Sequence, residues 1–186
     1  AASLLQLGRT RTTTGTTKLG MSSASLPYPR AAVAVTLQSQ HDNGTAHYLL
    51  VQRANPPDQG KWSLPGGKID VGETTLHAAQ RELLEETRLL PEDCEWYPHP
   101  FLTTDAIFQN EDDESSYAFH YLIAQCFAQT IRQPLPTVVP NDDALDAKWW
   151  TLAEIQQNDE TEKQVSKGVV EVIQREEELY EKDALL

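Results

Sequence analysis

The sequence is poor in cysteine, in basic residues and in long apolar runs, and each shortage excludes a class of protein. Its two cysteines, Cys94 and Cys126, form neither a disulfide framework nor a metal-ligand spacing. Lys and Arg number 15 against 28 Asp and Glu, giving a net charge of −13. This balance disfavours a broad nucleic-acid or anionic-membrane surface, because both need clustered cations. No run approaches the roughly 20 apolar residues that span a bilayer, so we expect no membrane partner.

The composition that remains indicates a folded globule. Of 186 residues, 39% are hydrophobic, and four are tryptophan. This length is sufficient for one domain with a full hydrophobic core.

Residues 1–30 differ from the rest of the chain. They contain no acidic residue and are rich in Ser and Thr, so we place a boundary near Arg30 between a leader and a domain spanning 31–186. The leader is expected to be disordered or to be a targeting segment for the mitochondrion or plastid, since such segments are basic and poor in acids. The expected location is the cytoplasm, with the mitochondrion or plastid as the alternative if the leader is a transit peptide. The only methionine is Met21, and if translation starts there, most of the basic leader is absent.

Hydrophobic patterns predict alternating strands and helices. Strands are expected at 31–39, 46–53, 95–103, 117–128 and 147–151, with an extended run at 62–64. Helices are expected at 74–87, 152–158 and 161–182. The strand at 117–128 is long and apolar enough to lie centrally in a sheet.

The stretch 66–89 combines a glycine-rich turn with a run of glutamates. Gly66 and Gly67 can supply tightly turned backbone and let a ligand approach closely. In a helix of 3.6 residues per turn, Glu82, Glu85 and Glu86 fall on one side. Their spacing alone also fits a solvated helical face. Three neighbouring carboxylates are equally the oxygen ligands that a hard divalent cation prefers.

The spacing of this stretch resembles the signature of the Nudix hydrolases. From Gly67 it runs through five residues, Glu73, seven residues, Arg81-Glu82, an aliphatic residue, any residue and Glu85-Glu86. The resemblance implies an α/β/α sandwich with a mixed β-sheet. It also implies a metal-dependent hydrolase with Mg²⁺, or alternatively Mn²⁺, as cofactor.

The resemblance assigns roles to individual residues. Glu82, Glu85 and Glu86 match the metal-binding and catalytic glutamates, and Glu73 and Arg81 match a pair that braces the loop against the helix. Arg81 could alternatively pair with Glu85 one turn on. For the general base, both Glu85 and a carboxylate of the acidic loop 111–114 are candidates.

Flanking segments resemble the branch of the family assigned as ADP-ribose pyrophosphatases. They are 53–57, 60–67, 119–121 and 141–149. The implied reaction converts ADP-ribose to AMP and ribose 5-phosphate. The alternatives are a pyrophosphatase for oxidised or non-standard nucleoside triphosphates and a nucleotide-sensing module without activity. The expected partners are a small nucleotide substrate and, as an option, a second copy of the chain in a homodimer.

Seven residues outside the glutamates are candidates for substrate binding. Trp62 and His120, with Phe119 as a further candidate, could stack on a nucleobase, or they could be core or sheet residues. Arg53 and Lys68 could hold phosphate or ribose, or they could be solvated or ion-paired. Gly66 and Gly67 complete the set.

The sequence departs from the family signature at Arg88, where the signature has glycine. A left-handed backbone costs an arginine roughly 1 kcal/mol more than a glycine. We therefore expect the segment after the helix to be shaped differently here.

Overall fold

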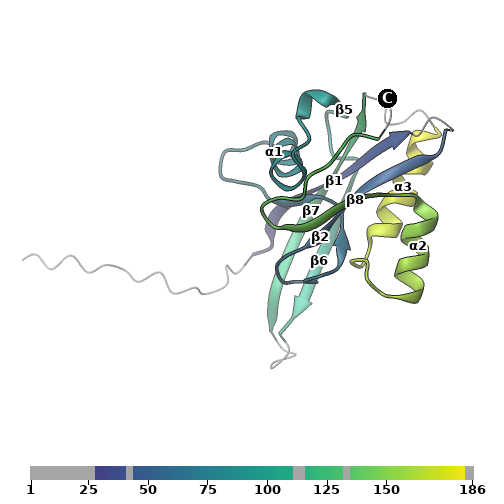
Figure 1. Ribbon diagram of the computed structural model, residues 1–186. Helices are drawn as coiled ribbons and strands as arrows, with labels where there is room; N and C mark the ends of the chain where they lie inside the picture. Colours follow the sequence, from purple (N-terminus) through teal and green to yellow (C-terminus); the bar gives the residue numbers. More distant parts are fainter. Residues whose placement is uncertain (1–27, 41–43, 111–115, 132–134, 183–186) are drawn as a thin grey trace, which may run out of the picture.

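The computed structural model describes residues 28–40, 44–110, 116–131 and 135–182. In this part of the chain a mixed β-sheet lies between one helix on one face and two helices on the other (Figure 1). This arrangement confirms the expected α/β/α sandwich. Of the predicted leader, only residues 28–30 lie within the described residues.

The sheet is built around two long strands that run parallel to each other. They are β1 (Arg30–Gln40) and β7 (Tyr117–Thr130), paired from Arg30↔Tyr121 to Gln38↔Gln129. The strand order is β3-β2-β1-β7-β5, with β4 on β1, β6 on β7 and β8 on β2. β7 thus lies centrally, as its apolar sequence predicted. Eight consecutive residues of β1 are buried because helices cover both faces of the sheet.

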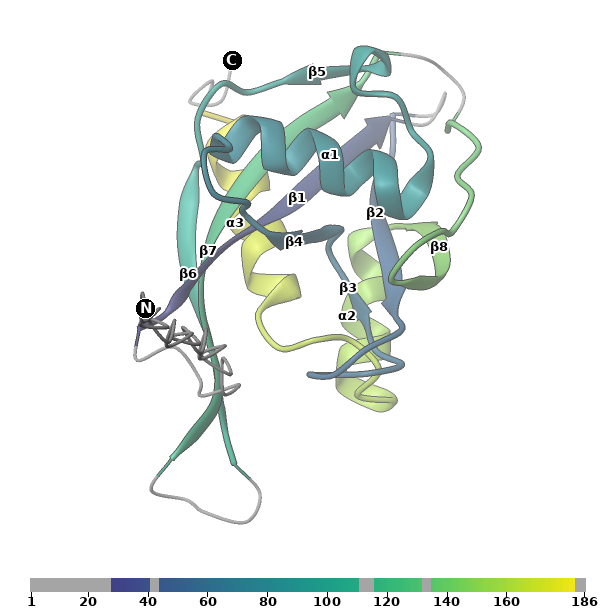
Figure 2. The ribbon, with the colours of Figure 1, turned by 90° about the vertical axis from the view of Figure 1, so that its left-hand side faces the viewer.

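The remaining strands pair antiparallel with this central pair or with β2. Their bounds are β2 Ala46–Arg53, β3 Trp62–Ser63, β4 Gly66–Lys68, β5 Cys94–Trp96, β6 Leu102–Gln109 and β8 Ala144–Trp150. A short 3-10 helix, η1 (Pro91–Asp93), precedes β5. Beyond the body of the molecule, β6 and β7 continue as a two-stranded ribbon (Figure 2).

The helix α1 (Thr75–Thr87) covers one face of the sheet. Its buried residues Ala78, Ala79 and Leu83 face the sheet, whereas Leu76 is only half-buried. They pack on Val33, Val35 and Leu37 of β1. Burying a leucine side chain such as Leu83 contributes about 1.5–3 kcal/mol.

Two helices cover the opposite face, α2 (Leu152–Thr161) and α3 (Val169–Tyr180). The first turn of α2 is closed by a capping box, in which Thr151 Oγ1 accepts from Glu154 N and Glu154 Oε2 accepts from Thr151 N. The two helices pack Ile155 and Ile173 against Tyr48 and Leu50 of β2.

Two predicted elements were wrong in part. The strand predicted at 95–103 stops at Trp96 and a new strand starts at Leu102, because prolines at 98 and 100 cannot donate to a ladder. The helix predicted at 161–182 starts only at Val169. Before it, Gln164 and Ser166 bond to Trp62 of β3 through their backbones, so this segment is extended.

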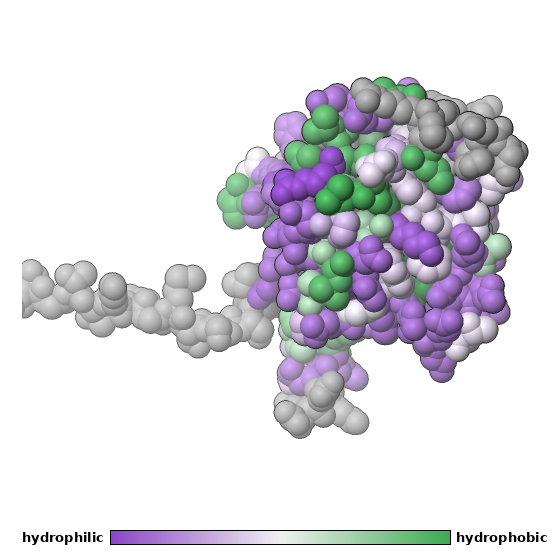
Figure 3. Space-filling view, viewed as in Figure 1, coloured by the Kyte–Doolittle hydropathy of each residue, from purple (hydrophilic) through white to green (hydrophobic). Residues whose placement is uncertain are grey.

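The surface agrees with the acidic composition. The face shown in Figure 3 is mostly hydrophilic, with small groups of hydrophobic residues between.

Cys94 and Cys126 are buried free thiols, and burial raises their pKa values to about 12 and about 11. Among the described residues no helix combines the length and the apolarity needed to cross a bilayer.

One buried carboxyl was not anticipated from the sequence. Glu176 of α3 is 0% exposed, and neither of its carboxyl oxygens has a hydrogen-bond partner among the described residues. The nearby Tyr48 hydroxyl donates instead to Glu177, at 2.8 Å. Burial raises the pKa of Glu176 to about 8, while an interaction with the Tyr48 hydroxyl opposes the shift and the charge of Glu177 adds to it. Burial therefore favours the neutral acid.

We expect Glu176→Gln to make the stability of the protein less dependent on pH. Because the folded state holds the Glu176 proton more tightly than the unfolded chain, the free energy of unfolding falls as pH rises from about 4.5 to about 8. The thermal midpoint measured between pH 5 and pH 9 should fall by several degrees more in the parent than in Glu176→Gln. About 1 kcal/mol corresponds to about 2–4 °C at this size. The exposed Glu171→Gln variant should keep the parent slope, and equal slopes in all three proteins would contradict the assignment.

Candidate functional site

The start of α1 sets the position of the three glutamates. Thr74 caps the helix, with its Oγ1 accepting from His77 N at 3.2 Å. Counting from this start, Glu82, Glu85 and Glu86 fall on the side of the helix that turns toward β4 and the loop 141–143. Leu83 between them faces the core.

Arg81 connects the glutamates to the loop that precedes the helix. Its Nε and Nη2 donate to the two carboxylate oxygens of Glu73, at 2.9 and 2.8 Å. Its Nη1 donates to Glu82 at 2.8 Å and to Glu85 at 3.0 Å, and Nη2 also donates to the Lys68 carbonyl at 2.9 Å. All five N–H donors of the guanidinium are therefore used. Both contacts considered from the sequence, with Glu73 and with Glu85, are present.

This network has clear electrostatic consequences. The hydrogen bonds from Arg81 lower the pKa of Glu73 to about 2, and those to Glu73 raise the pKa of Arg81. Glu73 also accepts from Asp70 N, at 3.1 Å. The ion pair thus holds the loop 68–73 against α1 across a wide pH range.

Each of the two glycines of β4 leaves room for a close neighbour, the β1 backbone at Gly66 and a carboxylate at Gly67. A Cβ at Gly67 would overlap the carboxylate of Glu82, and a Cβ at Gly66 would lie 2.7 Å from Ala34 Cα. Gly66 N donates to Glu86 Oε2 at 3.0 Å. The sequence predicted that these glycines let a ligand approach the backbone closely. In the structure Gly67 makes space for the Glu82 carboxylate.

Two of the glutamates are partly or fully removed from water. Burial raises the pKa of Glu82, against the opposing effect of Arg81. Glu86 is 6% exposed, and burial raises its pKa to about 8, while the Gly66 N–H opposes the shift and the charge of Glu82 adds to it. Desolvated carboxylates that repel one another are an environment that a cation would relieve.

The end of α1 corrects the expectation for Arg88. Arg88 adopts the left-handed conformation, with φ 61° and ψ 10°, and its N–H donates to Leu84 O at 3.0 Å. This is the conformation that a glycine would take there. The side chain offsets the backbone cost by donating from Nη2 to Asn141 Oδ1, at 2.8 Å.

Sequence reasoning missed the contribution of the loop 139–143. Asn141 bonds to the carbonyls of Glu85 and Glu86, through Nδ2 at 2.8 Å and through N at 3.0 Å. The charges of Asp142 and Asp143 raise the pKa values of Glu82 and Glu86, respectively. In the sequence, Asn141-Asp142-Asp143 is only part of a segment that resembles the ADP-ribose pyrophosphatase branch. No local pattern connects this segment with α1, which lies more than fifty residues earlier.

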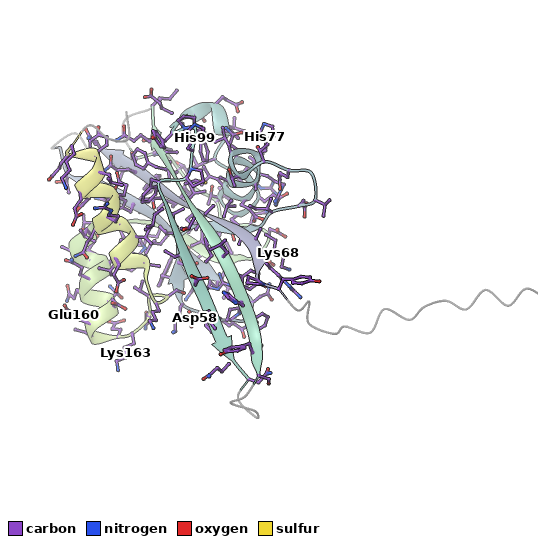
Figure 4. All side chains as sticks on the ribbon, turned by 180° about the vertical axis from the view of Figure 1, so that it is seen from behind. Asp58, Lys68, His77, His99, Glu160 and Lys163 are labelled. Carbon is purple, nitrogen blue, oxygen red and sulfur yellow. The ribbon has the colours of Figure 1, made fainter. Side chains whose placement is uncertain are left out.

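The two predicted phosphate-binding cations, Arg53 and Lys68, have different surroundings. Its positive charge lowers the pKa of Glu86, and its Nε donates to Pro57 O at 2.7 Å. Lys68 meets Arg81 through its backbone carbonyl, while its exposed side chain lines a hollow of about 360 Å³ together with Arg30 (Figure 4).

The predicted base-stacking residues are not gathered at the glutamates. Trp62 is 8% exposed and packs edge-on against Trp150 in the core under α2 and α3, as its alternative interpretation had it. Trp62 therefore belongs to the core and not to the candidate site. His120 lies on the β6–β7 ribbon, where its Nε2 is 3.0 Å from Asp105 Oδ1, and Phe119 stacks on Tyr121. The acidic loop 111–114 lies outside the described residues.

The residues fit a divalent cation by their chemistry. Glu82, Glu85 and Glu86 offer hard oxygen donors from one helix face, which suits Mg²⁺ or Mn²⁺. Among the described residues, no group of three or more His, Cys, Asp or Glu side chains is already arranged around one point. In this structure Arg81 Nη1 donates to both Glu82 and Glu85.

Known proteins share both the sequence and the fold of this chain. An ADP-ribose pyrophosphatase of Methanocaldococcus jannaschii is 44% identical over 64 residues, which are 34% of this chain and 36% of that protein. An 8-oxo-(d)GTP phosphatase of Mycolicibacterium smegmatis is 47% identical over 62 residues, 31% of this chain and 19% of that protein. The chain therefore matches about a third or less of the length of these curated relatives.

A solved structure resembles this chain over a longer stretch than the curated relatives do. The NUDIX domain of Shewanella oneidensis NrtR, complexed with ADP ribose, superposes with a TM-score of 0.59 at 25% identity. The match covers 86% of this chain and 93% of that one. The family model for the NUDIX domain matches residues 27–171, which include the whole sheet, α1 and α2. The chain thus belongs to the Nudix hydrolase family.

Proposed function

We propose that this protein is a divalent-metal-dependent pyrophosphohydrolase that cleaves the diphosphate of a nucleoside diphosphate derivative, with ADP-ribose as substrate. The observation that carries the proposal is the set of three glutamates on one face of α1, two of them desolvated and all three bordered by Arg81 or the β4 glycines.

Glu82, Glu85 and Glu86 are the residues that would hold the cation. A cation bound there would neutralise a diphosphate and lower the pKa of a bound water. The protein's own part is to fix the carboxylates through Arg81 and Gly66, and to add the positive charge of Arg53 beside Glu86. Most of the catalysis would therefore come from positioning and electrostatics.

The reaction consumes one water for each diphosphate cleaved. The water oxygen forms a new bond to one phosphorus, the P–O–P bridge breaks, and ADP-ribose yields AMP and ribose 5-phosphate. Glu85 is one candidate for accepting the proton of that water, and a carboxylate from 111–114 is the other.

The choice of ADP-ribose rests on the relatives. One curated relative is named an ADP-ribose pyrophosphatase, and the NrtR domain was solved in complex with ADP ribose. A second candidate substrate is an oxidised nucleoside triphosphate, because another relative is named an 8-oxo-(d)GTP phosphatase.

We expect the purified protein to hydrolyse ADP-ribose when Mg²⁺ or Mn²⁺ is present and to stop when the metal is chelated. The measurement is product release from a panel of ADP-ribose, NADH, ADP-sugars, dinucleoside polyphosphates and 8-oxo-dGTP. A higher kcat/KM for 8-oxo-dGTP than for ADP-ribose would establish the second candidate. Tight ADP-ribose binding without any product would instead indicate a sensing module.

Glu85→Gln should lower kcat by at least about 10²-fold, whether Glu85 binds metal or accepts the proton. The side chain is partly exposed, so the fold should persist and the thermal midpoint should stay close to that of the parent. Glu171→Gln, an exposed substitution in α3, serves as the control and should leave kcat unchanged. Near-normal rates of Glu85→Gln with metal in excess would remove Glu85 from the mechanism.

Gly67→Ala should weaken metal activation by roughly 10- to 100-fold, the usual effect of disturbing a group that positions a ligand. The added methyl would overlap the Glu82 carboxylate and displace it. The check is the Mg²⁺ concentration that gives half-maximal rate, together with circular dichroism to establish that the variant folds. An unchanged half-maximal concentration would show that Glu82 does not need its present position.

A further inference from the structure

The last turn of α1 has an unusually complete set of partners. A helix leaves its final four carbonyls without partners inside the helix. Here those of Leu84, Glu85, Glu86 and Thr87 accept, in order, from Arg88 N, Asn141 Nδ2, Asn141 N and Val139 N. The distances are 3.0, 2.8, 3.0 and 3.0 Å. The two carbonyls bound by Asn141 belong to two of the three site glutamates.

Arg88 and the Glu85 carbonyl select the same orientation of the Asn141 amide, one at each end. An amide has one acceptor end and one donor end. Because Arg88 Nη2 donates to Oδ1, the Nδ2 end is left to face the Glu85 carbonyl. A glycine at this position would reach the same left-handed backbone without strain, but it could not orient the amide.

The same loop is tied down at its other end. Asp143 O accepts from Ala54 N at 2.9 Å, and Asp143 Oδ1 accepts from Asn55 Nδ2 at 2.8 Å. The loop 139–143 therefore joins the end of α1 to the segment after β2, which begins next to Arg53. Its position is fixed from both sides.

We propose that Arg88 and Asn141 are positioning residues of the Nudix site, and that Arg88 acts by orienting the Asn141 amide that holds the backbone of Glu85 and Glu86. This inference rests on the proposed function for its kinetic consequences. Its structural part concerns the hydrogen bonds by which Asn141 links the end of α1 to the loop 139–143, and these do not depend on any substrate.

The decisive variant is Arg88→Gly, because it removes the guanidinium that bonds to the Asn141 amide while relieving the left-handed strain. Lys163→Gly is the matched control, since Lys163 is another exposed basic residue with positive φ, 51°, and lies at the end of α2 on the opposite side of the sheet from α1 (Figure 4). Both variants should keep or slightly raise the thermal midpoint. Only Arg88→Gly should lower kcat, by roughly tenfold, with KM changed less than about twofold. An unchanged kcat in Arg88→Gly overturns the proposal.

Two further variants test whether Arg88 acts through Asn141. Arg88→Lys retains a donor and should recover most of the kcat lost in Arg88→Gly. The double variant Arg88→Gly/Asn141→Ala should lose no more activity than Asn141→Ala alone. Independent, multiplying losses would show that Arg88 has a different role.

Hydrogen exchange separates this inference from the proposed function. In Arg88→Gly the amides of Val139 and Asn141, which bond to α1, should exchange at least about tenfold faster than in the parent and in Lys163→Gly. Equal protection in all three proteins would overturn the proposed role of Arg88, even where ADP-ribose is hydrolysed. Faster exchange in Arg88→Gly would support that role even where no substrate is cleaved, and in that case only the proposed function fails.

Discussion

Arg81 lies between carboxylates that would otherwise repel one another, and the arrangement of the site depends on it. Its planar guanidinium has five donors, and the structure uses each of them on Glu73, Glu82, Glu85 or the Lys68 carbonyl. A lysine could not do this, because its ammonium is a compact charge without the planar fork. The bidentate pair with Glu73 anchors Arg81 to the loop, so its remaining donors reach the helix from a fixed direction.

The glutamates are held from three directions, by parts of the chain that are far apart in sequence. Arg81 and Glu73 act from the N-terminal side, β4 acts through Gly66 N–H and the space at Gly67, and Asn141 acts on the backbone at the C-terminal end. Such support matters because a helix end frays unless its free carbonyls find partners.

The accuracy of the sequence predictions followed the range of the interactions involved. The α/β/α order, β2 and the central place of β7 were all confirmed, since each follows from the family resemblance or from local hydrophobic patterns. The strand predicted at 95–103 failed on a local signal, the prolines at 98 and 100. The other errors fell where tertiary contacts overrode a local pattern. Residues 164–166 have helix-compatible composition, yet they bond to β3 beside Trp62, and Arg88 takes a backbone that its type disfavours because Asn141 is within reach. Nothing local marked Glu176 for burial.

By itself, the sequence determined the family, the helix that carries the carboxylates and their common face, because spacing along a helix fixes direction around it. It also identified Arg81 and Glu73 as partners through their resemblance to the Nudix signature. Only the tertiary structure decided that Gly67 makes room for Glu82, that Trp62 belongs to the core, and that the loop 139–143 completes the end of α1. The physical reason is that hydrogen bonds and steric exclusion act over a few ångströms in space. The chain brings those atoms together only after the sheet has formed.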